Sequence, residues 1–279
     1  LLEINPSTGV VSLKSQANFE SGKTSYAFTV TATDADGDGS ATASAAKAVT
    51  ISLVDINEAP ANTIANATKT TAEDTAVTID GLSVADVDAG DTSLTVTLTS
   101  TNGTLSVANN VTSGLDGSGI AGSGTGTVTL TGTITAINAT LAGTDAVQFT
   151  PTLNFTGAAA ISITSKDDEN LQDVDADAVG VTVTAVDDAP EVTSSATGTA
   201  NEENSDLAIY TATASDVESE AITFTLGGAD ASLLEINPST GVVSLKSQAN
   251  FESGKTSYAF TVTATDADGD GSATASAAK

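Results

Sequence analysis

Short clusters of acidic residues recur along the chain and are the groups best suited to chemistry. They read DADGDG at 34–39, ADVDAGD at 85–91, KDDEN at 166–170 and VDDAP at 186–190. Clustered carboxylates repel one another unless cations are bound between them, and Ca²⁺ prefers carboxylate and carbonyl oxygens as ligands. The clusters therefore predict calcium sites. The alternative is a solvated acidic surface that provides solubility or salt tolerance.

Composition excludes several other classes of function. The chain has 36 acidic residues against eight lysines, with no histidine or cysteine and a net charge of −28, which argues against binding nucleic acid through its phosphates. Catalysis would have to use a carboxylate pair of the glycosidase type, but no tryptophan and few other aromatic residues are present to line a sugar cleft. We therefore expect no enzyme. No apolar run reaches the roughly 20 residues that span a bilayer, so a membrane-embedded protein is not expected either.

Three partial motifs point to other sites, and their contexts argue against each. The opening of a calcium-binding helix–loop–helix motif fits 34–39, but its twelfth position would be Ala45 and no helices flank it. A GxGxxG pattern at 117–122 precedes the strand-like TVTL and not a helix. The end of a phosphate-binding loop fits 21–24, but Ala17 stands where glycine is required.

Strands must position the acidic clusters, because alternation of apolar and polar residues dominates the chain. Residues 26–33 and the apolar series Val49, Ile51, Leu53 each predict a half-buried strand. A turn is expected at Asn5–Gly9, a loop at 113–126 and a short helical turn at 134–141. Seven further strands are predicted: 76–79, 94–98, 104–107, 127–130, 147–150, 161–164 and 181–184. The fold class is thus all-β, with tandem Greek-key sandwiches.

An internal repeat organises these strands into domains. Residues 1–47 and 233–279 are identical, with an offset of 232 residues, which indicates an array of whole domains. Acidic-Ala-Pro linkers end at Pro60 and Pro190. We therefore expect the C-terminal part of one domain at 1–60, a complete sandwich at 61–190, and at 191–279 a copy of the first domain type that lacks its last strand.

Joined in order, residues 191–279 and 48–60 resemble a cadherin repeat over nearly their whole length. The resemblance is carried by six motifs in the order of that family, although Glu58, Glu218 and Asn250 each replace an aspartate and the linker is one residue short. The motifs are Glu203-Asn204, Asp216-Val217-Glu218, Leu234–Val243, Asn250-Phe251-Glu252, Thr265–Asp268 and Asp55–Pro60.

The middle segment, 61–190, resembles the cadherin-like and Ig-like modules of large bacterial surface adhesins of the RTX, type I-secreted class. Its motifs are short, and they include Glu73-Asp74-Thr75, Asp86–Asp91, Asn102–Leu105, Asn154–Gly157, Asp167-Asp168 and Val186–Pro190.

These resemblances imply calcium sites at the two domain boundaries. The first would gather Glu20, Asp55, Asn57, Glu58, Asp86, Asp88 and Asp167. The second would gather Glu73, Asp187, Asp188, Asp216, Glu218 and Asp266. Further metal ligands implied by the motifs are Asp34, Asp36, Asp168, Glu203, Glu252 and Asp268.

The function implied is an extracellular structural array on a bacterial cell surface. Calcium-rigidified repeats would act as the spacer of a giant adhesin or filament in cell adhesion, biofilm formation or surface assembly. The partners would be further copies of the repeat in the same chain or filament. The alternative is a homophilic or polysaccharide-binding module, which a broad contact between copies or an exposed aromatic platform would favour.

The two copies of the repeated domain are incomplete in complementary ways. Segment 1–60 lacks the first strands of its sandwich, and 191–279 lacks the strand equivalent to 48–55. Such ends would expose unpaired edges. Either the chain is a window on a longer polypeptide, or a neighbouring copy supplies 48–55. We expect the window, with 1–60 and 191–279 at opposite ends, because a donated strand would bring Leu1–Lys47 into competition with its identical counterpart.

Overall fold

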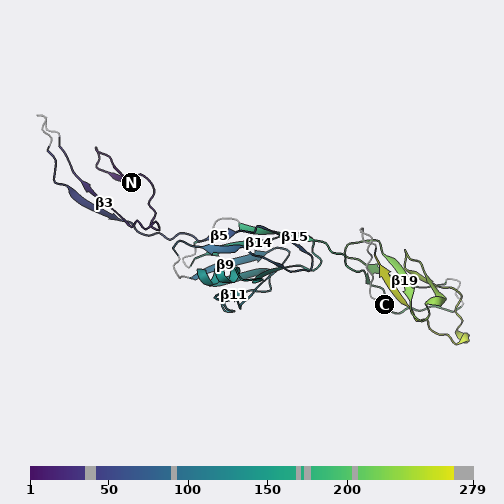
Figure 1. Cartoon of the computed structure of the whole chain (residues 1–279). Coiled ribbons are helices and arrows are strands. Elements are labelled where there is room, and N and C mark those ends of the chain that lie inside the picture. The colour runs from purple at the N-terminus through teal and green to yellow at the C-terminus, as the bar shows by residue number, and fades with distance from the viewer. Residues whose placement is uncertain (35–41, 89–92, 168–170, 173–176, 203–206, 267–279) are drawn as a thin grey trace. The chain divides into compact units, whose positions relative to one another are not determined.

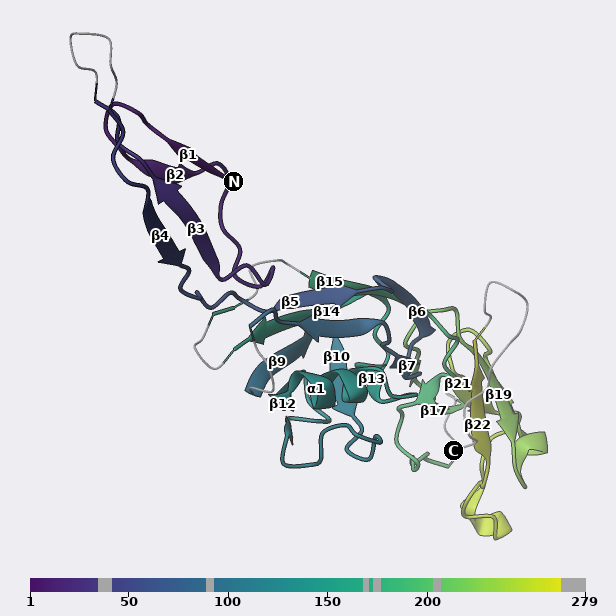
Figure 2. The same ribbon diagram turned by 60° about the vertical axis from the view of Figure 1, so that its left-hand side comes forward.

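The computed structural model describes residues 1–34, 42–88, 93–167, 171–172, 177–202 and 207–266. These residues form two compact units, each followed in Figures 1 and 2 by its colour. The first contains Leu1–Thr152 and Gly157–Val183, and the second Leu153–Thr156 and Thr184–Lys279. Both are built from antiparallel strands, which confirms the predicted all-β sandwich class. No helix in the described part of the chain is long and apolar enough to cross a membrane.

The first unit begins with two antiparallel hairpins. β1 (Leu2–Ile4) pairs with β2 (Val11–Leu13), and β3 (Ser25–Val30) pairs with β4 (Lys47–Ser52). The predicted turn joins β1 to β2: the Asn5 side chain accepts bonds from the Ser7 and Thr8 N–H groups at 2.9 and 3.1 Å, and Gly9 takes a φ of 72°. A positive φ of this kind is accessible to glycine without steric cost.

The rest of the first unit is a sandwich with a dense apolar core. A six-stranded sheet has the order β11-β12-β9-β14-β15-β6, and smaller sheets have the orders β10-β13-β7 and β5-β8. The core includes Leu94, Val96, Leu98, Leu105 and Phe149, all fully buried. The strands are β5 (Ala61–Ile64), β6 (Thr68–Ala72), β7 (Val77–Thr78), β8 (Leu82–Ala85), β9 (Ser93–Ser100), β10 (Gly103–Val107), β11 (Ile120–Ala121), β12 (Thr127–Thr133), β13 (Val147–Pro151), β14 (Gly157–Lys166) and β15 (Asp177–Thr184).

All seven strands predicted for this sandwich are present, and the helical turn is α1 (Ile134–Leu141). Thr133 begins the helix by accepting a bond from the Ala136 N–H group at 3.2 Å. Asn138 then joins the helix to β8, because its amide both donates to and accepts from the Val84 backbone, at 2.8 and 2.9 Å. The predicted loop at 113–126 differs in one respect, since it contains the short strand β11 paired with β12.

The second unit is built from short strands. β17 (Ala208–Thr211), β21 (Val242–Leu245) and β20 (Leu234–Ile236) form one sheet. β19 (Thr223–Gly227) pairs with β22 (Thr261–Thr265), and β16 (Glu191–Val192) with β18 (Ala214–Ser215). Two 3₁₀ turns, η1 (Ala231–Leu233) and η2 (Phe251–Ser253), complete the described elements.

The internal repeat places one sequence in two different surroundings. β1–β2 and β20–β21 have the same register, with Leu2 opposite Leu13 and Leu234 opposite Leu245. Leu13 is nevertheless 38% exposed, whereas Leu245 is 4% exposed. The difference arises because Leu207, Ile209 and Leu226, from the stretch that precedes the repeat in the second unit, pack against Leu234 and Leu245.

The predicted half-burial of the apolar series in β4 is wrong for one of its residues. The strand forms, but Ile51 is 51% exposed while Val49 is partly covered. Among the described residues of the first unit, β3 is the one strand that pairs with β4. The Ile51 side chain therefore lacks a packing layer among the described residues.

The two surroundings predict different costs for one substitution. Leu245→Ala should lower the free energy of unfolding by about 2–5 kcal/mol, because it leaves a cavity in a packed cluster. Leu13→Ala, in the same local sequence, should cost less than about 1 kcal/mol because that side chain is already exposed. Urea denaturation followed by circular dichroism would measure both, and equal effects would contradict the assigned burial.

Candidate metal centres

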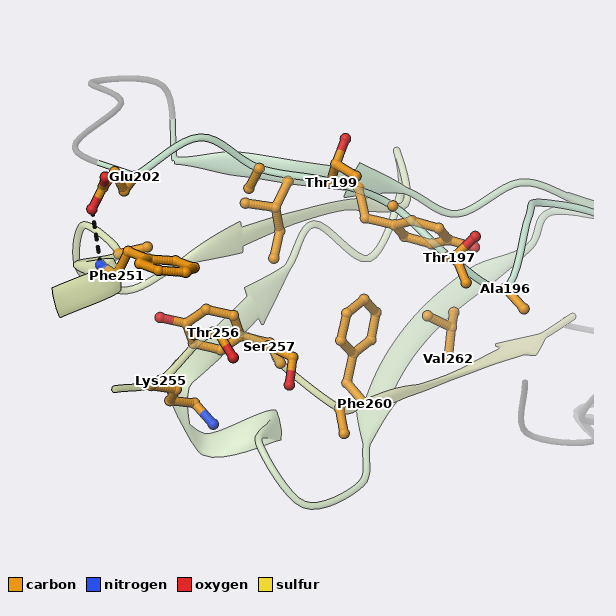
Figure 3. Close-up of a pocket in the computed structure, with 17 residues that line it drawn as sticks. Ala196, Thr197, Thr199, Glu202, Phe251, Lys255, Thr256, Ser257, Phe260 and Val262 are labelled. Atoms are coloured by element: carbon orange, nitrogen blue, oxygen red, sulfur yellow. Dashed lines mark hydrogen bonds between the residues drawn. The ribbon is translucent and has the colours of Figure 1, made fainter. Parts of the chain in front are cut away.

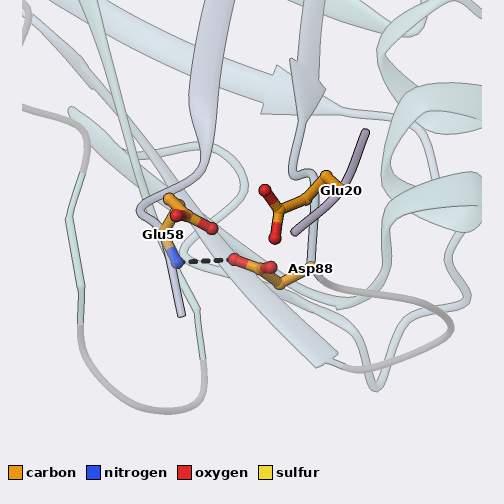
Figure 4. A group of neighbouring side chains, drawn as sticks. All are labelled: Glu20, Glu58 and Asp88. Atoms are coloured by element: carbon orange, nitrogen blue, oxygen red, sulfur yellow. Dashed lines mark hydrogen bonds between the residues drawn. The ribbon is translucent and has the colours of Figure 1, made fainter. Parts of the chain in front are cut away.

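The first carboxylate group consists of Glu20, Glu58 and Asp88 in the first unit. Each offers an oxygen, and these oxygens lie within 4.8 Å of one another. Figure 4 shows the three side chains pointing toward a common centre. Glu20 lies in the loop after β2, Glu58 in the segment after β4, and Asp88 follows β8. The three parts of the chain thus meet through their acidic side chains.

Backbone groups hold this first group in place. The Glu58 N–H group donates to Asp88 Oδ2 at 2.5 Å, and the Asp88 N–H group donates to Asp86 Oδ1 at 3.0 Å. The other Asp86 oxygen, Oδ2, is shielded from solvent and has no hydrogen-bond partner among the described residues. A buried carboxylate oxygen without a donor is costly unless a cation approaches it.

Asn57 and Asp167 form a further contact in the same unit. Asn57 Nδ2 donates to Asp167 Oδ2 at 2.6 Å, and the Leu171 N–H group donates to Asp167 Oδ1 at 2.8 Å. Asp167 is 5% exposed. It is therefore a buried carboxylate whose two oxygens both accept hydrogen bonds.

The electrostatics of the first group disfavour three ionised carboxylates without a cation. Partial burial raises the pKa of Glu58 above its ordinary value. The contact with Asp88 and the negative charges of Asp88, Glu20 and Asp55 raise this pKa further. A bound divalent cation would reverse this preference, because it favours the ionised form.

The second group consists of Asp187, Glu220 and Asp266 in the second unit. One oxygen from each lies within 4.8 Å of the others. Asp187 belongs to the segment before β16, Glu220 to the loop after β18, and Asp266 directly follows β22. Asp266 is 2% exposed, an unusual burial for an aspartate.

Several oxygens around the second group are shielded from water yet receive no hydrogen bond. Asp187 Oδ2, Asp216 Oδ2 and Glu220 Oε2 have no partner among the described residues. Asp216 is held beside them by the Glu220 N–H group, which donates to its Oδ1 at 3.3 Å. Burial raises the pKa of Glu220, and the charges of Asp187, Asp266, Asp216 and Glu218 raise it further. Oxygen-only donors at these separations fit the coordination preferences of Ca²⁺.

Other predicted residues have contacts of their own. The Asp188 N–H group donates to Glu218 Oε2 at 3.4 Å in the second unit. Glu73 is a buried residue of the first unit. Asp34 accepts a bond from the Thr42 N–H group at 2.8 Å, and Glu252 is exposed on η2. Predicted residues that lie outside the described residues are Asp36, Asp168, Glu203 and Asp268.

Equivalent residues in the two copies of the repeat differ in whether they belong to a carboxylate group. Asp34 and Asp266 occupy the same position of the repeated sequence, and so do Glu20 and Glu252. Asp266 and Glu20 join carboxylate groups, whereas Asp34 and Glu252 belong to none formed by the described residues. Local sequence therefore does not decide which copy contributes to a site.

Sequence analysis missed Glu220. The signal was the alternating series Asp216, Glu218, Glu220, which places a third acid two residues beyond the expected motif. The loop after β18 turns this third side chain toward Asp187 and Asp266.

No protein-family model and no curated protein matches this chain. Among solved structures, it is similar to repeats EC22–24 of mouse cadherin-23, with 18% identity and a TM-score of 0.47 over 99% of this chain and 80% of the other. It is also similar to the protocadherin gammaB7 EC3–6 cis-dimer structure, with 18% identity and a TM-score of 0.47 over 99% of this chain and 61% of the other.

The raised pKa values of Glu58 and Glu220 predict how stability depends on pH. In chelator, folding takes up protons above the ordinary glutamate value of 4.5, so the free energy of unfolding should rise as pH falls from 7 toward 5. With saturating calcium, protons compete with the ion and the slope should reverse. Urea denaturation at several pH values would measure both slopes.

Acids whose pKa values are lowered affect the free energy of unfolding in a different, more acidic pH range. Asp230, for example, has a pKa below 3.8 because it accepts a bond from the Ala259 N–H group and faces Lys255. The stabilisation that Asp230 provides is lost only as pH falls below that value.

A chelated chain that loses stability between pH 7 and 5 would contradict the carboxylate groups described above.

Proposed function

We propose that the chain is an extracellular, calcium-binding structural repeat that serves as a spacer in a bacterial surface adhesin or filament. The observation that carries the proposal is the second carboxylate group. Buried oxygens of Asp187, Asp216 and Glu220 lack donors among the described residues, and Asp187 and Glu220 each bring an oxygen within 4.8 Å of one from Asp266. In a chain of net charge −28, such an arrangement is stabilised by a divalent cation.

Calcium would act on the segments that connect the sandwiches. Asp187 lies in 185–190 and Glu58 in 53–60, and neither segment forms a strand. An ion held jointly by such a residue and by loops of a sandwich would restrict the connecting segment. A spacer in cell adhesion, biofilm formation or surface assembly requires connecting segments that are ordered.

The proposed partners are further copies of the repeat in the same chain or filament, and the proposed role is not enzymatic. The ion pairs that the described lysines form, Lys69–Asp80 and Lys255–Asp230, lie outside both carboxylate groups. Homophilic contact or binding of a surface polysaccharide remains the alternative function.

The repeat provides matched variants that test calcium binding. Asp266→Asn should weaken calcium binding at its site by about tenfold or more, because the ligand charge sets affinity. Asp34→Asn changes the same position of the repeat and should leave affinity unchanged. Glu20→Gln and Glu252→Gln form the second pair, with the loss expected for Glu20 alone. Isothermal titration calorimetry of the full chain measures all four, and equal effects within a pair would refute the assigned sites.

Calcium should also order the connecting segments and stabilise the folded chain. An ion that binds only the folded form adds about 2.7 kcal/mol at a hundredfold excess over its Kd. The melting temperature should rise, and the backbone order parameters of 53–60 and 185–190 should increase from below about 0.6 toward about 0.85. The control is the same buffer with magnesium in place of calcium, at equal ionic strength. Unchanged melting and unchanged order parameters would exclude a calcium-rigidified spacer.

A further inference from the structure

Asn102 and Gly103 form the one Asn-Gly pair in the sequence, and they lie at a corner of the sandwich in the first unit. β9 belongs to the six-stranded sheet and β10 to a three-stranded sheet, so Thr101 and Asn102 carry the chain from one sheet to the other. Asn102 is exposed and has a φ of 56°. Asparagine adopts this left-handed region more readily than most residues, so the corner favours asparagine at this position.

The residue that follows Asn102 has to be glycine. A Cβ atom at position 103 would lie 2.5 Å from the Thr150 carbonyl oxygen and closer still to the ring of Phe149. Phe149 is fully buried in the core, so it has no free space into which it could move. The fold therefore favours asparagine and requires glycine at adjacent positions, for two separate steric reasons.

An asparagine followed by glycine is a chemically reactive pair. The backbone nitrogen of the glycine attacks the side-chain carbon Cγ, the bond from Cγ to Nδ2 breaks, and ammonia leaves with the proton of the attacking N–H group. Water then opens the resulting five-membered imide at either carbonyl carbon, which gives aspartate or isoaspartate. Water is consumed and ammonia is released, with no other reactant. Glycine favours the reaction because it has no side chain to hinder the attacking nitrogen.

Two other asparagines show what distinguishes this pair. At Asn250, the next residue is Phe251, whose N–H group donates to Glu202 Oε2 at 2.9 Å, as Figure 3 shows. The nitrogen that would attack Asn250 is thus both hindered and hydrogen-bonded. Asn154 has the same φ as Asn102, 56°, but Phe155 follows it. Asn154 is therefore a matched control that differs from Asn102 in the next residue.

Three hydrogen bonds hold the corner closed. Asn102 Nδ2 donates to the Ala158 carbonyl oxygen at 3.1 Å, and the Thr152 N–H group donates to the Asn102 carbonyl oxygen at 2.9 Å. Ser100 Oγ donates to the Gly103 carbonyl oxygen at 2.8 Å. The first bond restrains the amide that would leave, and the other two fix the backbone on which the attacking nitrogen lies.

We propose that Asn102 is a site of spontaneous deamidation, at which water converts the amide to aspartate and isoaspartate whenever the corner opens. Folded proteins open locally with free energies below that of global unfolding. Opening of the corner frees the side chain from Ala158 and lets Cγ meet the Gly103 nitrogen. The closed corner protects the pair that its own geometry requires. The site uses none of the carboxylate groups, so it is independent of the proposed function.

The products of the reaction do not fit the closed corner. Aspartate lacks the donor to the Ala158 carbonyl oxygen and places a negative charge beside it, which leaves a hydrogen bond unmade. Isoaspartate lengthens the backbone by one methylene group. The bond from Thr152 and the close contact of Gly103 with Phe149 then cannot both form. A prolonged opening of the corner is thereby made irreversible.

The first test follows the reaction by mass spectrometry of peptic peptides from the full chain, after incubation at mildly alkaline pH. Samples are kept in buffer or in urea above the unfolding midpoint. The mass increase that accompanies replacement of NH₂ by OH should accumulate at Asn102 in urea, and at least about tenfold more slowly in buffer, because only the open fraction reacts. Asn154 should stay unmodified in both samples over the same period.

The second test loosens the corner without unfolding the chain. Ser100→Ala removes the donor to the Gly103 carbonyl oxygen and should raise the rate of deamidation in buffer about fivefold. Ser118→Ala is the control, because the Ser118 hydroxyl bonds to Asp116 in another loop of the same sandwich and its loss should leave the rate unchanged.

The third test concerns irreversibility. Asn102→Gly retains access to the left-handed conformation and has no amide to lose. After increasing times in urea and dilution into buffer, the refolded fraction of the original chain, measured by circular dichroism, should fall as isoaspartate accumulates. The Asn102→Gly chain should retain its refolded fraction.

Three results would overturn the proposal. Equal modification of Asn102 and Asn154 in urea would refute the reactive pair. Equal rates at Asn102 in buffer and in urea, or equal rates in the two serine variants, would refute protection by the corner. Complete refolding of chains that carry isoaspartate would refute irreversibility.

Discussion

Repulsion between carboxylates is the constraint on which the rest of this structure depends. Three parts of the chain that are distant in sequence converge at Glu20, Glu58 and Asp88, and three others at Asp187, Glu220 and Asp266. Neither convergence is favourable for ionised side chains in partly dehydrated surroundings. The strands fix the backbone in positions that bring the acidic side chains together, and a bound cation is the simplest group that would stabilise this arrangement. The apolar cores and the acidic clusters are thus separate features, the first contributing to folding and the second carrying the proposed ion binding.

The exact repeat separates what local sequence determines from what tertiary packing adds. The turn at Asn5 and the turn at Asn237 have the same hydrogen bonds, and Gly9 and Gly241 have φ values of 72° and 70°. Burial differs because Leu207 and Leu226 cover only the second copy. Gly241 also shows a tertiary requirement that Gly9 lacks, since a Cβ atom there would lie 2.2 Å from the Ala212 carbonyl oxygen. The glycine at this position of the repeat is thus required for a positive φ in both copies, and in the second copy it also allows a close backbone approach.

Sequence patterns predicted the strands of the middle sandwich because alternation is a local signal. A short helical turn was also expected where α1 lies. They also identified most acids of the two carboxylate groups. They could not distinguish Asp266 from Asp34 or Glu20 from Glu252, because each pair has the same neighbours in sequence for many residues on either side. Glu220 escaped notice since its role depends on the course of the loop after β18. The exposure of Ile51 was likewise unpredictable, because alternation indicates an apolar face and not what covers it.

The pairing of β3 with β4 has a mechanical consequence. The chain enters β3 and leaves β4 at the same end of the hairpin, where Ser25 lies opposite Ser52. A pull between the segment before β3 and the segment that carries Glu58 therefore acts first on this end pair and then on the next pairs in turn, up to Val30 opposite Lys47. The hairpin is loaded so that it unzips, and its resistance to such a pull is set by one pair at a time.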